Sequence, residues 1–441
     1  MTVIQKIKSI IPTLNEAQLE AITSVEGPVL IIAGPGTGKT LTIIARTLYL
    51  LLSGKAQPEE IVLTTFTEKS AFELKDRLSQ LARKLNYSGK LHLLKVGTIH
   101  SLCNDFIEKF ITYTPLRKGY TVLDDLSQVF FLFENFDEIV NSINNKYLGK
   151  WINKWNCINE LIIYINKITE EIIEPASLKN SDSDFLNSLA ESYERYWQKM
   201  YESNRIDFSH LQKVFYDLLS NEEIYPKIKQ NIKYVMVDEY QDTNYVQEQI
   251  LLKIARPENN ICVVGDEDQS LYRFRGATVR NILEFPDHFV NCQQIKLITN
   301  YRSHKEIIER NNRFITSIDW KGYRHSKEIQ ADPDSKFPDY PAVFSIWGEN
   351  KDDEAKRFVR LIKFLKEKQI IQDWSDVALL LKSVKPDHSG HYIQALKDSN
   401  IPYFAPRAKR YFENDEIKLL MACYSIIFGF YGETLNNYLH K

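Results

Sequence analysis

The sequence predicts an α/β fold in which buried parallel strands alternate with helices. Short apolar runs end in polar, Gly-rich or acidic clusters, and segments with helical periodicity follow them. One run, PVLIIA, continues through GPGTGKT into the apolar helical segment LTIIARTLYLLL. Because ligands bind beyond the carboxyl ends of parallel strands, the residues that close each run are candidates for a functional site. The runs are Pro28–Ala33, Glu60–Thr65, Leu94–Gly97, Tyr234–Val237 and Ile261–Gly265.

The spacing of these runs divides the chain into four parts. Between residues 111 and 205, Gly and strand-like runs nearly vanish, and Asn, Ile, Tyr and Trp recur at helical spacing, which predicts a helical insertion. The insertion separates two parts of a first α/β domain, 1–110 and 206–290, and a partial second α/β domain is expected over 291–441. Its expected strands are Gln294–Ile298, Ala342–Trp347 and Asp376–Leu381, and its expected helices are Lys351–Glu367 and His391–Asp398.

Composition excludes several classes of protein. The 441 residues are 44% hydrophobic, which suits two to four domains at about 100–200 residues each. The net charge of −2 comes from 56 basic and 58 acidic residues, so a nucleic-acid site has to be a local patch. The five cysteines lie far apart without a C-x-x-C pair, which argues against a zinc or iron–sulfur site and a secreted disulfide framework. Without a signal peptide or an apolar run near ~20 residues, we expect a soluble, cytoplasmic protein with no membrane partner.

The segment AGPGTGKT predicts a phosphate-binding loop. The backbone N–H groups of Gly36 to Lys39 would surround a β-phosphate, and the following helix N-terminus favours negative charge. Lys39 would neutralise the β- and γ-phosphate oxygens, and the Thr40 hydroxyl would bind Mg²⁺. The strict motif has Gly where this chain has Ala33, and the alternative is an ordinary turn between a strand and a helix. The loop comprises Ala33, Gly34, Pro35, Gly36, Thr37, Gly38, Lys39 and Thr40.

Two further strand ends carry groups that suit nucleotide hydrolysis. YVMVDEYQD places adjacent acids after a buried strand, and we assign Asp238 as the Mg²⁺ ligand and Glu239 as the catalytic base. Alone, such a pair is more often a solvated strand end. After the next strand, in VVGDEDQSLYRFRGA, Gln269 is expected to bind the γ-phosphate. A nucleotide site containing ATP and Mg²⁺ is therefore predicted.

From Leu14 to Ser303 the motifs and their order resemble the superfamily-one helicases of the UvrD/Rep/PcrA group. The matching segments are LNEAQLEAI, AGPGTGKT, TTFTEKSAFELKDRL, GTIHS, IDFSHL, DEYQDTN, GDEDQSLYRFRGA and NYRS. The resemblance implies two RecA-like P-loop NTPase motor domains, the first carrying the helical insertion and the second incomplete here. It also implies ATP bound in a cleft, with Gln18 contacting the adenine, Tyr301 stacking on it and Arg302 reaching the γ-phosphate.

The same resemblance implies a site for single-stranded DNA. Aromatic side chains that stack on bases give about 1–3 kcal/mol per base without sequence preference, which suits a motor that accepts any sequence. A Phe after a strand is more often part of a core, an isolated His is more often structural, and Arg275 could equally brace the interdomain cleft. The expected DNA-binding residues are Thr65, Phe66, Thr67, His100, Tyr272, Phe274 and Arg275.

Beyond Arg302 the resemblance weakens. Two family motifs, T-x-H-x-x-K-G and an Arg-rich segment, are not found before Lys441, so the sequence favours a chain whose C-terminal motifs are absent. We therefore expect an ATP-dependent 3′-to-5′ DNA helicase, truncated and needing a C-terminal half for unwinding. The alternative is a nucleotide-gated DNA-binding subunit that relies on a separate chain for the remaining motifs. A regulatory NTPase unrelated to DNA would leave Phe66, Tyr272 and Phe274 unexplained.

Overall fold

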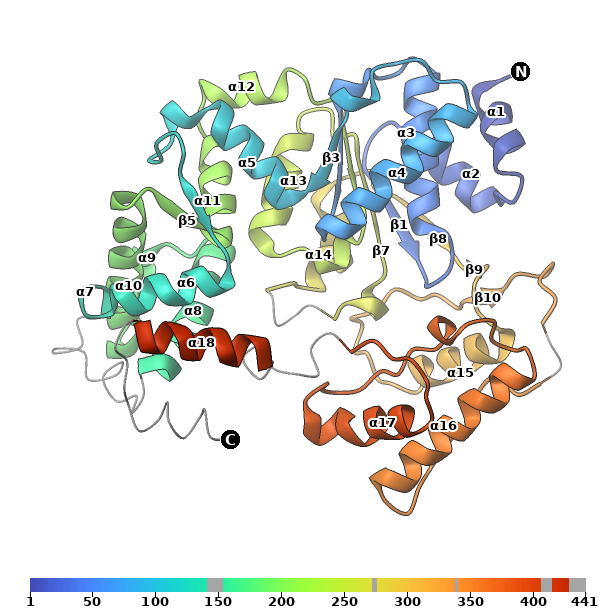
Figure 1. Cartoon of the computed structure of the whole chain (residues 1–441). Helices are drawn as coiled ribbons and strands as arrows, with labels where there is room; N and C mark the ends of the chain where they lie inside the picture. Colours follow the sequence, from blue (N-terminus) through green and yellow to red (C-terminus); the bar gives the residue numbers. More distant parts are fainter. Residues whose placement is uncertain (141–153, 272–275, 338–339, 406–414, 428–441) are drawn as a thin grey trace. The chain divides into compact units, whose positions relative to one another are not determined.

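The computed structural model describes residues 1–140, 154–271, 276–337, 340–405 and 415–427 of the 441. The chain forms two compact units, Met1–Asp339 and Tyr340–Lys441. Figure 1 labels the helices and strands of both units. The larger unit contains every nucleotide-site residue that the sequence predicts.

A six-stranded parallel sheet forms the centre of the first unit, with strand order β3-β2-β6-β7-β1-β8. The five strands that the sequence predicts for the first domain are confirmed to within one residue at each end. The sheet contains β1 (Val29–Ala33), β2 (Ile61–Thr65), β3 (Lys95–Thr98), β6 (Tyr234–Val237), β7 (Ile261–Gly265) and β8 (Gln293–Leu297).

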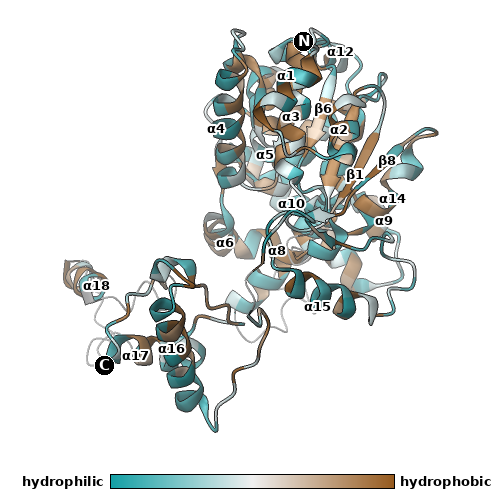
Figure 2. Cartoon of the chain, turned by 90° about the vertical axis from the view of Figure 1, so that its right-hand side faces the viewer, coloured by the Kyte–Doolittle hydropathy of each residue, from teal (hydrophilic) through white to brown (hydrophobic). Residues whose placement is uncertain are grey.

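Alternating side chains of the strands build two apolar cores, one on each face of the sheet. In β1, Leu30 and Ile32 join one core, whereas Val29, Ile31 and Ala33 join the other. Figure 2 shows β1 in brown, and the helices cover it. The first core includes α5 (Ile99–Lys109), α11 (Phe208–Leu218), α12 (Ile224–Lys229), α13 (Tyr245–Ala255) and α14 (Arg280–Glu284). The second includes α1 (Val3–Ile10), α2 (Glu16–Thr23), α3 (Lys39–Leu52) and α4 (Glu68–Lys84).

The helical insertion has its own apolar core and a short strand pair at its base. In the pair, β4 (Thr121–Leu123) lies parallel to β5 (Arg205–Asp207). The entry and exit of the insertion therefore lie side by side (Figure 1). Its helices are α6 (Asp125–Glu134), α7 (Phe136–Val140), α8 (Lys154–Glu170), α9 (Pro175–Lys179) and α10 (Asp184–Glu202), and a third apolar cluster joins them.

The structure corrects the expected strands of the second α/β domain. The strand predicted at Gln294–Ile298 is β8, but it pairs with β1 in the first sheet, where Ile295 and Leu297 are buried. Within the described residues, Ala342–Trp347 and Asp376–Leu381 form no strand. An alternating apolar pattern becomes a strand only where a partner strand supplies hydrogen bonds.

The remaining elements complete both units. The predicted helix at Lys351–Glu367 is confirmed as α16, and the helix predicted at His391–Asp398 begins earlier, at Pro386. In the second unit Val359, Ile362 and Ile401 form a small core. These elements are β9 (Thr299–Asn300), α15 (Lys305–Thr316), β10 (Gln330–Ala331), α16 (Lys351–Glu367), α17 (Pro386–Asp398) and α18 (Asp415–Ile427).

Among the described residues, no helix combines the length and the apolar character that a membrane span needs.

The core that supports the site can be tested at Phe215. Its ring is fully buried in α11 and stacks on Phe106 with ring centroids 5.3 Å apart. Phe215→Ala should lower the free energy of unfolding by about 3–5 kcal/mol, because the lost ring leaves a cavity. Phe72→Ala, at an exposed ring of α4, should change it by less than about 0.5 kcal/mol. Urea unfolding followed by circular dichroism measures both, and equal effects would contradict this account of the core.

Candidate active site

The phosphate-binding loop joins the carboxyl end of β1 to the start of α3. Gly36 and Gly38 have φ values of 71° and 81°, a left-handed conformation that favours glycine. The Thr37 hydroxyl donates to the carbonyl oxygen of Gly34 at 2.8 Å and closes the turn. Since Gly38 is the N-cap of α3 and has no side chain to cap it, the first backbone N–H groups of this helix are open to an anion.

Two side-chain contacts bring the acids after β6 to this loop. The Thr40 hydroxyl donates to Asp238 Oδ2 at 3.1 Å, and Lys39 Nζ lies 3.2 Å from Glu239 Oε2. Glu239 has a φ of 54°, a left-handed backbone that is uncommon outside glycine and concentrates at functional sites. Residues about two hundred positions apart in the sequence thus form one polar site.

Burial changes the acidity of two carboxyl groups here. Burial and the nearby charge of Glu239 raise the pKa of Asp238 to about 6, and Lys39 and the Thr40 hydroxyl only partly oppose this. Burial and the same Glu239 charge raise the pKa of Asp242 to about 7. Adding a divalent cation would relieve this repulsion, so the hydroxyl and carboxylate oxygens of Thr40 and Asp238 fit Mg²⁺, which prefers oxygen ligands.

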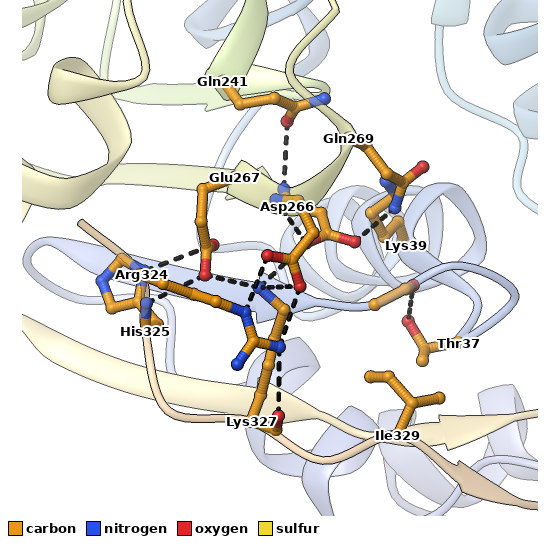
Figure 3. Close-up of polar contacts among 12 residues, drawn as sticks. Thr37, Lys39, Gln241, Asp266, Glu267, Gln269, Arg324, His325, Lys327 and Ile329 are labelled. Carbon is orange, nitrogen blue, oxygen red and sulfur yellow. Dashed lines mark hydrogen bonds and ion pairs between the residues drawn. The ribbon is translucent and has the colours of Figure 1, made fainter. Parts of the chain in front are cut away.

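The loop after β7 is tied to the acids by Gln241. Its Nε2 donates to Glu239 Oε2 at 2.8 Å, and its Oε1 accepts from the backbone N–H of Asp266 at 3.1 Å. Gln269 Nε2 donates to Asp266 Oδ2 at 2.5 Å (Figure 3). A Cβ at Gly265 would lie 2.5 Å from Gln241 Oε1, so this close approach requires glycine. The γ-phosphate role of Gln269 stays a prediction.

The NYRS segment lies against the phosphate-binding loop. Asn300 Nδ2 donates to the carbonyl oxygen of Pro35 at 2.8 Å, and Asn300 Oδ1 accepts from the backbone N–H groups of Arg302 and Ser303, each at 2.8 Å. The backbone N–H of Tyr301 donates to the Gly36 carbonyl oxygen at 2.9 Å. This anchoring holds the backbone of Arg302 beside the loop.

The residues predicted to contact adenine meet at the start of α2. Gln18 Nε2 donates to the Thr37 carbonyl oxygen at 3.0 Å, and Gln18 Oε1 accepts from the backbone N–H of Asn15. Asn15 Nδ2 in turn donates to the hydroxyl of Tyr301 at 2.9 Å. The structure therefore brings Gln18 and Tyr301 to one end of the loop, and their adenine contacts remain predictions.

The predicted DNA residues of the described region follow β2 and β3 at the same edge of the sheet. Thr65 lies opposite Thr98 in the paired strands and is buried, and Thr67 caps α4 by accepting from the Ser70 backbone N–H. Phe66 is partly buried. Their contacts with DNA stay predictions, as do those of Tyr272, Phe274 and Arg275, which lie outside the described residues.

His100 packs against α11. Its Nε2 lies 2.8 Å from Gln212 Nε2, and its ring meets Phe208 edge-on with centroids 5.3 Å apart. Burial lowers the pKa of His100 to about 4, so its ring is neutral at pH 7 and accepts from the Gln212 amide. In this arrangement His100 joins α5 to α11, and its contact with DNA also stays a prediction.

Three groups of residues hold these loops in place, although the sequence assigned them no role. Gln241 stands inside DEYQD and Asn300 opens NYRS, so adjacency to predicted residues was the only signal for them. A third group, Arg324 and Lys327, binds the acids after β7 from about sixty positions further along the chain. No local pattern marks these two cations.

Family models match almost the whole chain. The model described as "UvrD/REP helicase N-terminal domain" matches residues 14–290, which is more than half of the chain. The chain belongs to the UvrD/REP helicase family. The model described as "UvrD-like helicase C-terminal domain" matches residues 295–432. A mixed α/β fold with a parallel RecA-like sheet agrees with this membership.

Named relatives in this family are DNA helicases. The chain is 30% identical to ATP-dependent DNA helicase Rep of Buchnera aphidicola over 423 residues, covering 94% of this chain and 61% of that protein. It is 30% identical to the probable DNA helicase II homolog of Rickettsia conorii, covering 93% and 60%. It is 28% identical to ATP-dependent DNA helicase PcrA of Leuconostoc citreum, covering 94% and 52%. The chain thus spans about three fifths or less of the length of these UvrD-like relatives.

The expectation that the family's C-terminal motifs are absent is wrong, because the C-terminal domain model matches 295–432. The two polar motifs that the sequence lacks cover only a few positions of the C-terminal domain. The apolar pattern of a domain, in contrast, extends over its whole length. The expectation of a separate chain that supplies these motifs rested on their absence, and it finds no support.

The raised pKa of Asp238 predicts a pH-dependent cost in stability. A carboxyl group with a pKa of about 6 in the folded protein and 3.8 as its usual value destabilises the fold when ionised. That cost is complete above about pH 6 and disappears below about pH 4. In metal-free buffer, Asp238→Asn should therefore raise the Tm at pH 7.5, and the gain should shrink as the pH falls through this window.

The control for this prediction is Asp76→Asn, at an exposed acid of α4 whose carboxylate accepts from Gln80. Its Tm difference from the wild type should stay small at every pH. Differential scanning calorimetry measures both variants. A lower Tm for Asp238→Asn at pH 7.5 would contradict the raised pKa.

Proposed function

We propose that this chain is an ATP-driven motor that acts on single-stranded DNA, as an ATP-dependent DNA helicase or translocase of the UvrD type. The observation that carries the proposal is the pair of contacts Thr40–Asp238 and Lys39–Glu239. They join a phosphate-binding loop to the acids that nucleotide hydrolysis needs. The names of the relatives, ATP-dependent DNA helicases, support the same activity.

Each group has a proposed role in hydrolysis. The N–H groups of the loop and Lys39 bind the phosphates, and Thr40 and Asp238 hold Mg²⁺. When bound, Mg²⁺ neutralises charge on the β- and γ-phosphate oxygens. Glu239 orients the attacking water and takes its proton. Gln269 and Arg302 reach the γ-phosphate, and Gln18 and Tyr301 bind the adenine.

DNA is proposed to cross the edge of the sheet where β2 and β3 end. Phe66 follows β2 there, and base stacking on such a ring contributes about 1–3 kcal/mol per base without sequence preference. The resemblance adds Thr65, Thr67, His100, Tyr272, Phe274 and Arg275 to this surface, and it supports 3′-to-5′ movement.

The ATP site is tested by steady-state hydrolysis with and without oligo(dT). Glu239→Gln should keep nucleotide affinity and lower kcat by about 10²–10⁴-fold, because the water loses its base. Lys39→Ala should weaken nucleotide binding as well, because it removes the countercharge of the phosphates. Lys55→Ala, which breaks an exposed ion pair with Glu26, is the matched control and should leave both unchanged.

Two results would refute this assignment. The first is a wild-type chain whose hydrolysis does not respond to single-stranded DNA. The second is a Glu239→Gln variant with full turnover, which would remove Glu239 from the proposed mechanism.

Polarity is tested by displacement of streptavidin from biotinylated oligo(dT). A 3′-to-5′ motor should displace it from the 5′ end at least about tenfold faster than from the 3′ end, because each molecule pushes in one direction only. Glu239→Gln should give only the spontaneous rate at both ends. Faster displacement from the 3′ end would reverse the proposed polarity.

A further inference from the structure

The segment Arg324–Ile329, here called the strap, contacts two loops of the nucleotide site. Lys327 Nζ lies 2.9 Å from Asp266 Oδ1, 2.5 Å from Glu267 Oε1 and 3.2 Å from Asp268 Oδ2. One ammonium group thus binds all three acids that follow β7, and Figure 3 labels Asp266 and Glu267 beside it. At the other end of the strap, a Cβ at Gly34 would fall 2.1 Å from Ile329 Cδ1, so Ile329 packs directly on the phosphate-binding loop.

The ammonium group of Lys327 is charged although it is buried. Burial alone would lower its pKa, but Asp266 and Glu267 raise the pKa above its usual value. Burial would likewise raise the pKa of Glu267, and His325 together with Lys327 lowers it to about 2. The Lys327 ammonium fills the centre of the three acids and balances part of their negative charge.

Both cations of the strap contact Asp268, and Lys327 also reaches Asp266 and Glu267. Arg324 donates twice to Asp268, from Nε at 2.8 Å and from Nη2 at 3.0 Å. Lys327 reaches Asp266, which is fully buried. The Arg324–Asp268 ion pair therefore lies at the edge of the cluster, whereas the Lys327–Asp266 ion pair is linked to residues of the nucleotide site.

Asp266 connects Lys327 to the residues proposed for hydrolysis. Its Oδ1 faces Lys327 and its Oδ2 accepts from Gln269 Nε2 at 2.5 Å. Its backbone N–H donates to Gln241, whose amide donates to Glu239. If the ammonium were removed, the Asp266 carboxylate would lose its countercharge in a site without water access and would turn or take up a proton. The hydrogen bond that orients Gln269 would then lose its fixed acceptor.

We propose that Lys327 is a positioning residue for ATP hydrolysis, which acts by holding Asp266 so that Gln269 is oriented toward the γ-phosphate. The inference rests on the proposed function and adds a residue to it. Lys327 contacts the acids after β7, and its proposed effect on hydrolysis passes through Asp266. A residue that only stabilised the fold would affect turnover independently of Gln269.

A double-mutant cycle separates the two roles. Lys327→Gln should lower the DNA-stimulated kcat by about tenfold with little change in the KM for ATP, because Gln269 acts on the γ-phosphate during turnover. In a Gln269→Ala background the same substitution should change kcat by less than about twofold. Arg324→Gln is the matched control from the same cluster: it should lower the Tm and leave kcat within about twofold.

Three results decide the inference. An equal loss of kcat from Lys327→Gln in both backgrounds would overturn it, and so would an Arg324→Gln variant that loses as much kcat as Lys327→Gln.

If Lys327→Gln does not fold, the cycle is run on Glu267→Gln/Asp268→Asn, where removal of the lysine leaves one carboxylate instead of three. A wild-type chain without DNA-stimulated hydrolysis would refute the proposed function as well, whereas an active wild type with additive effects refutes the inference alone.

Discussion

The parallel pairing of β1 with β7 on one side and β8 on the other is the constraint on which the site depends. The register places Ile32 opposite Gly265 and Ala33 opposite Leu297, so three chain segments leave the sheet at the same level. The phosphate-binding loop follows β1, the acids that contact Lys327 follow β7, and the NYRS segment follows β8. The acids after β6 lie one strand further away, and the first residues of α3, Lys39 and Thr40, span that distance.

Charge balance distinguishes two kinds of buried acid at this edge. Asp238 is close to another carboxylate and shares one lysine with it, and its pKa is raised to about 6. Glu267 contacts the His325 ring and the Lys327 ammonium, which it shares with Asp266 and Asp268, and its pKa is lowered to about 2. An acid whose negative charge is only partly balanced by its neighbours can still bind a cation. An acid whose charge is better balanced holds the backbone in place. The two loops therefore suit different tasks: one for binding a ligand and one for rigidity.

Much of this architecture follows from local sequence. Apolar runs bounded by turn residues predict the strands, and the turn chemistry at their ends predicts the loop and its acids, because those signals lie within a few neighbouring residues. The pairing of β8 with β1 depends on distant partners, so the sequence predicts the strand but not its place in the first sheet. Lys327 meets its acids only in the folded chain, and Asn300 orients Arg302 through a carbonyl oxygen of Pro35. Such contacts leave no periodic pattern.

The strand pair β4–β5 has a consequence for how the family can vary. It holds the two ends of the helical insertion together, with Thr121 opposite Arg205, while the insertion keeps an apolar core of its own. Because β4 pairs with β5, the two ends of the insertion stay side by side, and the insertion is connected to the sheet as a loop that is already closed. Since the entropy of loop closure grows only with the logarithm of length, residues can be gained or lost beyond this base at little cost to the sheet. Selection can therefore reshape the insertion without disturbing the edge of the sheet that carries the candidate site.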